Sequence, residues 1–348
     1  MPKPKRVSQQ TIARELGVSQ ALVSLTLNGQ RDRISPDTYK RIWDFAMKAG
    51  YKPKGIKLED SPNDTRTRQI GVILRAGVNV HTQGSYFSHV MHGLNSAVLD
   101  HGYTTAFLGS EDTLDSDRLA QFFGPGHAIK GVLLMGEVKE TFLTQLRDRT
   151  EHIAAVSARH AGLCHSVLGN EPQALKFLVQ HLYDLGHRRI GWLGGNAGLG
   201  RHETRLHAMR SAKQALGLDH DPRYEVLRQE GDRAEGSEAM LSLLPTMKRS
   251  DFPTAFITYN ISMAIGAIRV LQREGKHVPA DISIAAADYS STASKFTPRI
   301  TSAGCDPVVL GRSAAELVLS ESSKAGGTLN DLVLASQLYV GESTSAAR

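Results

Sequence analysis

The sequence predicts a multidomain protein: a small all-α head containing a helix-turn-helix, followed by a larger α/β body of two doubly wound lobes. Two observations predict the head: apolar residues at helical spacing on both sides of Gly17, and a concentration of basic residues in the same stretch. The body is predicted by short apolar runs that alternate with helical segments in two consecutive arrays of similar size. A length of 348 residues accommodates two or three domains.

The helix-turn-helix is predicted between residues 11 and 28. An apolar stripe at helical spacing indicates its first helix and consists of Ile12, Ala13 and Leu16. Gly17 supplies the backbone freedom that ends this helix in a tight turn. Ser19 is a preferred N-cap for a second helix, whose inward positions are expected at Leu22, Val23, Thr26 and Leu27. The second helix of such a pair is sized for the major groove of DNA.

A third helix is predicted over residues 37–49. Ser35 is an N-cap residue, and Pro36 suits the first helical position that follows it. The sequence Gly-Tyr-Lys-Pro at residues 50–53 stops the helix, and its core face is expected at Tyr39, Ile42, Trp43, Phe45 and Ala46. The alternative is an ordinary helical hairpin, against which the third helix argues because it closes a compact bundle.

Basic residues are concentrated in this head. Residues 1–57 contain twelve Lys and Arg against four Asp and Glu, a net charge of +8, whereas the rest of the chain has 29 basic and 31 acidic residues. A basic head on a near-neutral body suits neutralisation of DNA phosphates by one domain. A solvated basic face is the plain alternative, but it does not explain why the excess coincides with the helix-turn-helix.

The remaining composition points to a cytoplasmic protein without a metal or a cofactor. Cys164 and Cys305 are isolated, fit no metal-ligand spacing and are typical of a reduced compartment. The N-terminal residues contain no apolar segment typical of a signal peptide. No apolar run approaches the roughly 18 residues of a membrane span, so no membrane partner is expected.

The chain after the head is predicted to be a linker followed by the two lobes. Residues 54–68 are polar and turn-rich, which places the head at 1–53 and the body at 69–348. Strands are expected at 70–74, 104–108, 131–135, 153–156, 190–193, 224–227, 255–258 and 282–286. Helices are expected at 85–101, 115–123, 140–149, 172–185, 203–216, 236–244 and 261–273. The order starts afresh around 168–170, and a ligand site is expected at the carboxyl ends of the strands.

Several motifs resemble those of the LacI/GalR family of bacterial transcription regulators. In the head they are Ile12-Ala13, Gly17-Val18-Ser19, Val23-Ser24, Asn28-Gly29, Ser35-Pro36-Asp37-Thr38 and Gly50-Tyr51-Lys52-Pro53. In the body they are 185–190 (LGHRRI), 205–208 (RLHA), Asn260 with Ala264 and Gly266, 281–284 (DISI), Asp288 and 298–302 (PRITS). The resemblance covers nearly the whole chain.

The resemblance implies a repressor that binds a near-palindromic DNA operator as a homodimer and responds to a small-molecule effector, a sugar or sugar derivative. It also implies a body like the periplasmic sugar-binding proteins, in which the chain crosses between the lobes three times. Lobe 1 is then expected at about 69–166 and 303–328, and lobe 2 at about 167–302 and 329–345.

The second helix is expected to read bases. Gln20 can pair with adenine through two hydrogen bonds, and Ala21 and Leu25 offer apolar contacts such as a thymine methyl. Leu25 stands where many family members have Arg. The other DNA contacts are expected from Ser19, Ser24, Asn28, Arg33 and Ser35. The family's hinge leucine, which wedges into the minor groove, is replaced by Asp60, and Leu58 is the candidate substitute.

The family resemblance also implies the effector contacts. Arg205, Asn260 and Asp288 match cleft positions, and the last two follow predicted strands. Tyr86 and Phe87 resemble an aromatic pair that packs on ligand faces, although core packing is the alternative. The chain departs from the family pattern at Ile261, where Asp is usual, at 287–289, and at Gly341, where Arg is common.

Two other classes of function remain as alternatives. The first is a carbohydrate-active or phosphate-handling α/β enzyme, since residues 194–200 (GGNAGLG) follow a strand like a phosphate cradle. Arg201 and His202 stand where a P-loop needs Lys and Ser/Thr, so no catalytic residue is proposed. The histidines are expected on the solvated surface, among them His89, His92, His181 and His187. The second alternative is a binding protein without a DNA role, against which the basic head argues.

Overall fold

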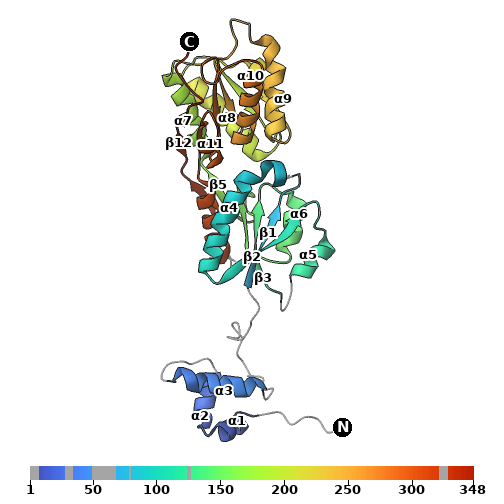
Figure 1. Ribbon diagram of the computed structural model, residues 1–348. Coiled ribbons are helices and arrows are strands. Elements are labelled where there is room, and N and C mark those ends of the chain that lie inside the picture. The colour runs from blue at the N-terminus through green and yellow to red at the C-terminus, as the bar shows by residue number, and fades with distance from the viewer. Residues whose placement is uncertain (1–7, 28–33, 49–67, 78–79, 124–126, 321–327) are drawn as a thin grey trace. The chain divides into compact units, whose positions relative to one another are not determined.

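The computed structural model describes residues 8–27, 34–48, 68–77, 80–123, 127–320 and 328–348. The chain divides into two compact units, residues 1–65 and 66–348 (Figure 1). Among the described residues no helix is long and apolar enough to cross a membrane. The predicted linker at 54–68 lies outside the described residues except for Arg68, as do Asn28, Arg33 and the hinge candidate Leu58.

The described residues of the first unit form three short helices: α1 (Gln9–Leu16), α2 (Gln20–Leu27) and α3 (Pro36–Lys48). Gly17 ends α1 in the left-handed conformation, with φ of 65°, as the predicted turn requires. The Ser19 hydroxyl accepts a 3.1 Å hydrogen bond from the backbone N–H of Leu22, so the predicted N-cap of α2 is confirmed. One apolar core joins the three helices and consists of Ile12, Ala13, Val23, Leu27, Ile42 and Ala46.

Lobe 1 of the second unit is a parallel sheet covered on both faces. Its strands lie in the order β11-β5-β4-β3-β1-β2. Their bounds are β1 Arg68–Leu74, β2 Tyr103–Ser110, β3 Ile129–Met135, β4 Ile153–Val156, β5 His165–Gly169 and β11 Asp331–Leu334. Helices α4 (Val80–Asp100) and α12 (Pro307–Leu319) pack on one face, and α5 (Ser116–Phe122) and α6 (Glu140–Arg147) pack on the other.

Close packing of α4 against α12 depends on two residues without side chains. A Cβ on Gly93 would lie 1.9 Å from the backbone oxygen of Val308, and one on Gly311 would lie 2.0 Å from that of Val90. Any larger residue at either position would push the helices apart. Since α12 lies far from the rest of lobe 1 in the sequence, this contact fastens the returning chain to the lobe.

Lobe 2 repeats the architecture with one antiparallel strand. The order is β12-β10-β9-β8-β6-β7, and only β12 runs antiparallel to its neighbour. Its strands are β6 Ile190–Gly194, β7 Glu225–Leu227, β8 Ala255–Thr258, β9 Ser283–Ala286, β10 Thr301–Gly304 and β12 Gln337–Tyr339. Its helices are α7 Glu171–Asp184, α8 Gly200–Ala215, α9 Arg233–Leu243, α10 Ile261–Arg273 and α11 Thr292–Lys295, with 3-10 turns η1 Pro222–Tyr224 and η2 Leu244–Thr246.

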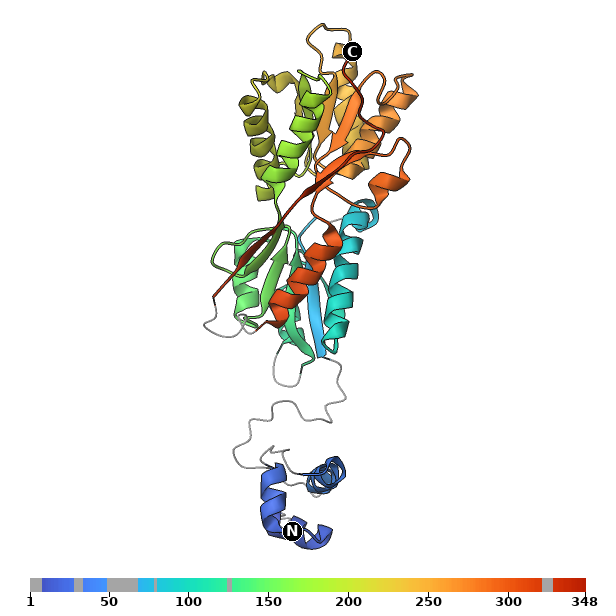
Figure 2. The same cartoon turned by 90° about the vertical axis from the view of Figure 1, so that its left-hand side faces the viewer.

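The chain crosses between the lobes three times, but the crossings differ from the predicted boundaries. Residues 165–169 form β5 of lobe 1, a strand that the sequence reading missed because it opens with two polar residues. The segment 301–304 is β10 of lobe 2, whereas 331–334 is β11 of lobe 1. Figure 2 shows the last crossing as the dark red strand that runs from one lobe to the other. The observed elements begin and end within a few residues of their predicted bounds. The largest difference is at α4, which begins at Val80.

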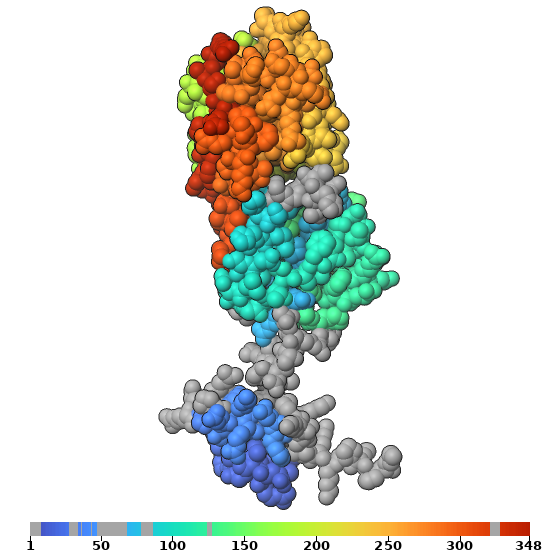
Figure 3. Space-filling view, viewed as in Figure 1, coloured from blue at the N-terminus to red at the C-terminus, as the bar shows by residue number. Residues whose placement is uncertain are grey.

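The C-terminal residues are fastened to lobe 2, where they lie in dark red on its surface (Figure 3). The Ser343 hydroxyl donates to the Ile284 carbonyl at 2.5 Å, and the Ala347 N–H donates to the Leu185 carbonyl at 2.8 Å. His187 is buried and within 2.8 to 3.1 Å of Thr254, Ser283 and the Ser345 carbonyl. His181 contacts Thr344 at 2.9 Å. His181 and His187, two of the four histidines expected on the solvated surface, therefore pack against the C-terminal residues.

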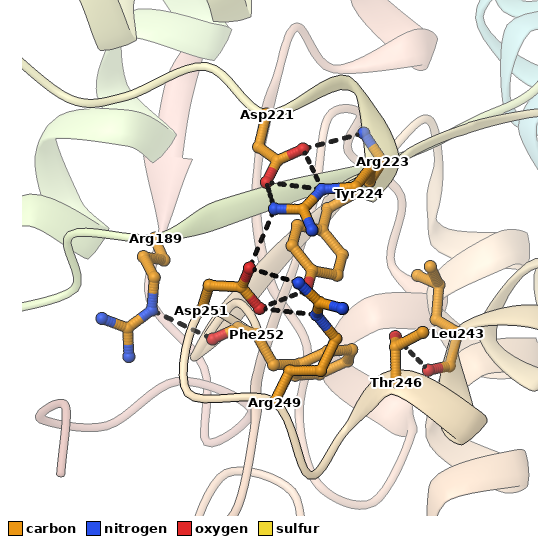
Figure 4. Close-up of polar contacts among 9 residues, drawn as sticks. All are labelled: Arg189, Asp221, Arg223, Tyr224, Leu243, Thr246, Arg249, Asp251 and Phe252. Atoms are coloured by element: carbon orange, nitrogen blue, oxygen red, sulfur yellow. Dashed lines mark hydrogen bonds and ion pairs between the residues drawn. The ribbon is translucent and has the colours of Figure 1, made fainter.

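A network of ion pairs closes the end of lobe 2 where its strands begin (Figure 4). Asp251 accepts from Arg223 at 2.8 Å, from Arg249 at 2.9 Å and from the Tyr224 hydroxyl at 2.9 Å. These arginines hold the pKa of Asp251 well below its usual range, with Arg249 as the first cause. The network joins η1 to the loop before β8. This end of the sheet lies opposite the carboxyl ends of the strands, where a ligand site is expected, so the role of the network is structural.

Candidate functional site

Two surfaces carry the residues that the sequence singled out: the outward face of α2 and the cleft between the lobes. On α2, Gln20, Ala21 and Leu25 are exposed, and Leu25 keeps 44% of its accessible surface. An exposed leucine on an eight-residue helix is not used by the core of the head, so it is available to an external partner.

The polar residues predicted to contact DNA from the helix ends also have structural partners. Ser19 caps α2 through its hydroxyl, and Ser35 caps α3 by accepting from the Thr38 N–H at 3.3 Å. Both remain exposed, whereas Ser24 is half-buried. Exposed basic side chains of the described head are Arg14, Lys40 and Arg41.

The cleft lies where the carboxyl ends of both sheets face each other. It encloses an empty volume of about 770 Å³, part of which is open solvent. All five predicted effector-binding residues line it: Tyr86, Phe87, Arg205, Asn260 and Asp288. The tertiary structure thus brings together side chains that are spread over 203 positions of the sequence.

Arg205 is the most buried of these five residues. Its side chain is 1% exposed and its Nε and Nη2 atoms donate to Glu171 at 2.6 and 3.2 Å. Its Nη1 donates to the Tyr259 carbonyl, and its guanidinium lies 4.6 Å from the centre of the Tyr259 ring. Every nitrogen of this guanidinium therefore has an internal partner, which the sequence reading did not anticipate.

Asn260 and Asp288 hold the start of α10 at the cleft. The Asn260 oxygen accepts from the Met263 N–H at 2.8 Å, and its amide nitrogen donates to the Gly231 carbonyl at 2.7 Å. One oxygen of Asp288 accepts from the Ile261 N–H at 2.8 Å. Burial raises the pKa of Asp288, while the nearby Arg205 and Arg201 oppose that effect. Asn260 is accordingly an N-cap first, and Asp288 keeps one oxygen for the cleft.

The aromatic pair lies on the lobe 1 side of the cleft. The rings of Tyr86 and Phe87 meet edge to face, with centres 5.6 Å apart. The Tyr86 hydroxyl is 2.7 Å from the Ser157 hydroxyl, and the Arg201 guanidinium lies 5.1 Å from the Tyr86 ring centre. Both rings line the cleft and also pack against the lobe 1 core.

Direct bonds join the lobes across the cleft. Arg75, which follows β1, donates to the Asn196 side chain, which follows β6, at 2.9 Å. Glu137, after β3, accepts from the Gly200 N–H at the start of α8 at 2.8 Å. His89 on α4 is 3.0 Å from the Ser291 hydroxyl, so this histidine too was wrongly expected to be solvated, whereas His92 is exposed.

The sequence did not point to several cleft residues, chiefly Arg75, Glu137, Asn196 and Arg201, or to Glu171, which bonds to two arginines of the cleft. A signal existed for Arg201, because it lies four positions before Arg205 and therefore on the same face of a helix. The only non-glycine residues with positive φ that the described backbone contains are Ser157 and Asn196, and both line the cleft. Backbone strain of this kind is enriched at functional sites.

Comparison with known proteins agrees with this architecture. A model of the periplasmic binding protein-like domain matches residues 179–344. The HTH-type transcriptional repressor PurR of Aliivibrio salmonicida (strain LFI1238) is 27% identical over 311 residues, 88% of this chain and 90% of its own. The HTH-type transcriptional regulator CelR of Thermobifida fusca is 25% identical over 353 residues, 99% of this chain and 100% of its own. The chain is therefore similar over nearly its whole length to helix-turn-helix transcription regulators, and its motifs resemble those of the LacI/GalR family.

A solved structure of the same architecture is a transcriptional regulator CelR–cellobiose complex. It aligns with a TM-score of 0.68 and 23% identity, covering 97% of this chain and 100% of that one. Both curated relatives are named as regulators and neither as an enzyme. Among the described residues no group of three side chains could hold a metal ion.

The departures from the LacI/GalR pattern have structural consequences. Ile261 is buried at the start of α10, where it lines the cleft and its backbone N–H donates to Asp288. A Cβ on Gly341 would lie 2.3 Å from the Arg299 carbonyl, so this backbone leaves no room for the family's arginine. The cleft of this protein is thus built from a set of polar groups that departs from the LacI/GalR pattern.

Proposed function

We propose that the chain is a sequence-specific transcriptional repressor whose grip on its operator is controlled by a small molecule in the cleft. The observation that carries the proposal is the exposed face of α2 in a compact three-helix head that also holds the basic excess of the chain. Base reading needs such an outward helix face, and phosphate neutralisation needs the basic charge.

The assembly that fits this proposal is a homodimer on a near-palindromic operator. One helix-turn-helix covers a single half-site, and two-fold symmetry of the protein imposes the same symmetry on the DNA. We propose the cytoplasm as the compartment, since an operator-binding protein works where the chromosome lies. Regulation requires no catalytic step, so the protein is proposed to act by binding alone.

The proposed effector is a sugar or sugar derivative. Cellobiose is the ligand named for the CelR complex that shares this fold. In this cleft, Asp288 offers a carboxylate oxygen, and Ser262 and Ser290 offer hydroxyls, which suit hydrogen bonds to a polyhydroxyl ligand. Ligand binding would shift operator affinity through the lobes by about 1–3 kcal/mol, as is typical of coupled sites.

The decisive test is selection of DNA from a pool of random-sequence duplexes by the full-length protein. We expect enrichment of a near-palindrome with half-sites about 10 base pairs or a multiple apart. We also expect affinity to fall steeply as salt is raised, because counterions are released from the phosphates. A pool that shows no enriched sequence after repeated rounds would remove the DNA-reading function.

The alternative of a binding protein without a DNA role predicts a different result in the same assay. Its body would still bind a sugar and gain thermal stability, since a ligand of the native state raises the melting temperature. Its head would show only weak binding without sequence preference.

A further inference from the structure

Two features of the cleft would ordinarily attract an anion. Arg201 and Arg205 lie four positions apart on α8 and both line the cleft. The N-terminus of α8 itself, a helix of 16 residues, carries the positive end of the helix dipole. A cleft with both features would favour a phosphorylated or carboxylated ligand.

A single carboxylate already holds both guanidiniums. Glu171, the first residue of α7, accepts from the Nε of Arg201 at 2.7 Å through one oxygen and from the Nε of Arg205 at 2.6 Å through the other. The Glu171 side chain is 12% exposed. Burial alone would raise the pKa of Glu171, but the two arginines outweigh it and lower the pKa, so the carboxylate is charged at neutral pH.

A second carboxylate covers the start of α8. Glu137 comes from the other lobe, after β3, and its oxygen accepts from the Gly200 N–H at 2.8 Å. The glycine-rich loop before α8, which resembles a phosphate cradle in sequence, therefore already has an anion at its helix end. The two observations are independent, because Glu137 and Glu171 follow different strands and approach α8 from different elements.

The groups left for a ligand are polar but nearly balanced in charge. Within the described residues, the structure shows no hydrogen bond from the terminal nitrogens of Arg201. It shows none to one of the two oxygens of Asp288 either. Both residues line the cleft with Ser262 and Ser290. A guanidinium edge beside a carboxylate oxygen suits pairs of hydroxyls, whereas the carboxylates of Asp288, Glu137 and Glu171 would repel an added anion.

We propose that Glu171 is a specificity-determining residue, which by neutralising Arg201 and Arg205 makes the cleft select an uncharged polyhydroxyl ligand and reject its anionic counterparts. The inference rests on the proposed function in one respect only: it assumes that the cleft is a ligand site. It goes further by naming the charge of the ligand and the residue that sets it.

The test compares the wild type with Glu171→Gln, using inorganic phosphate as the probe at constant ionic strength. The substitution preserves the side chain's size and removes its charge, which leaves the positive charge of Arg201 and Arg205 without its carboxylate partner and able to attract phosphate through charge-assisted hydrogen bonds. We expect the variant to bind phosphate roughly ten-fold or more tightly than the wild type, by calorimetry and by the rise in melting temperature. Equal phosphate affinity of the two proteins overturns the proposal.

A matched control removes a carboxylate from another arginine of the same lobe. The exposed Arg210 pairs at 2.5 Å with Glu225, whose side chain is nearly buried, outside the cleft. Glu225→Gln should leave phosphate binding at the wild-type level, and a gain as large as that of Glu171→Gln would overturn the assignment to the cleft. Glu171→Asp keeps the charge and should keep the rejection of phosphate.

Two further arms keep the proposal testable. If Glu171→Gln does not fold, Glu171→Ala removes the same charge and should also gain phosphate binding; no gain there overturns the proposal. On the wild type, a thermal-shift panel pairs neutral sugars with their phosphates. We expect stabilisation by neutral members only, and a larger shift with a sugar phosphate than with its parent sugar overturns the proposal.

The outcomes separate this inference from the proposed function. DNA selection reads out the head, whereas phosphate binding reads out the cleft. Selection of an operator with no gain by Glu171→Gln leaves the regulator and removes the specificity role. A gain in phosphate binding by Glu171→Gln without any selected DNA keeps the specificity role and removes the regulator function.

Discussion

Gln20 is the exposed side chain of α2 that can form two hydrogen bonds with one base. Gln20→Ala removes both bonds without disturbing the head's core, because Gln20 is not part of it. We expect the variant to lose about 1–3 kcal/mol on the selected half-site and to keep its binding to scrambled DNA. Competition binding measures this difference. Gln10→Ala, at an exposed position of α1, is the control, and unchanged discrimination by Gln20→Ala would contradict the assignment.

At the scale of the single residue, chemistry alone could not tell a ligand contact from a structural one. Asn260 and Arg205 both line the cleft, yet each uses its polar atoms on neighbouring backbone or on Glu171. The family resemblance placed these residues correctly at the cleft. What each atom does depends on Glu171 and Gly231, residues at distant sequence positions whose approach no local pattern reveals.

At the scale of the element, α10 depends on its N-cap. Asn260→Ala removes the bond to the Met263 N–H and the tie to Gly231, and we expect it to lower the free energy of unfolding by about 0.5–2 kcal/mol without any ligand. Urea unfolding followed by circular dichroism measures the loss. Ser262→Ala, also at the cleft but with no bond that the structure shows, should stay within about 0.5 kcal/mol. Equal stability of wild type and Asn260→Ala would mean that the cap is dispensable.

Most helices and strands could be predicted because their local signals are strong. Strand β8 and helices α2 and α10 begin and end within a residue of the predicted bounds, since each has an apolar run or stripe and a capping side chain. Strand β5 was missed because its stability comes from its neighbours: it lies between β4 and β11 and includes buried His165 and Ser166. Pairing between strands so far apart in sequence leaves no local signature.

At the scale of the whole molecule, stability should depend on pH through buried histidines. Burial lowers the pKa of His160, His181 and His187 below 6.5. Just below pH 6.5 the unfolded chain therefore binds more protons than the native protein, and the free energy of unfolding falls as the pH is lowered. Melting temperatures from pH 8 to 5.5 measure this loss.

His187 supplies a direct check of that explanation. It holds the C-terminal residues through the Ser345 carbonyl, so His187→Gln should lower the melting temperature at neutral pH and weaken its dependence on pH. His92→Gln, at an exposed position, should keep the wild-type dependence. A melting temperature that stays constant or rises on acidification would contradict the role of burial.

The sequence by itself determined the head, the alternation of the body, the family resemblance and the positions that reach the cleft, because these depend on local periodicity, caps and motifs. Only the tertiary structure decided where the chain changes lobes, which histidines are buried and how the cleft's charges are paired. Glu171, Arg201 and Arg205 show the reason. Their interaction depends on the distance between charged atoms from two helices, and the fold sets that distance.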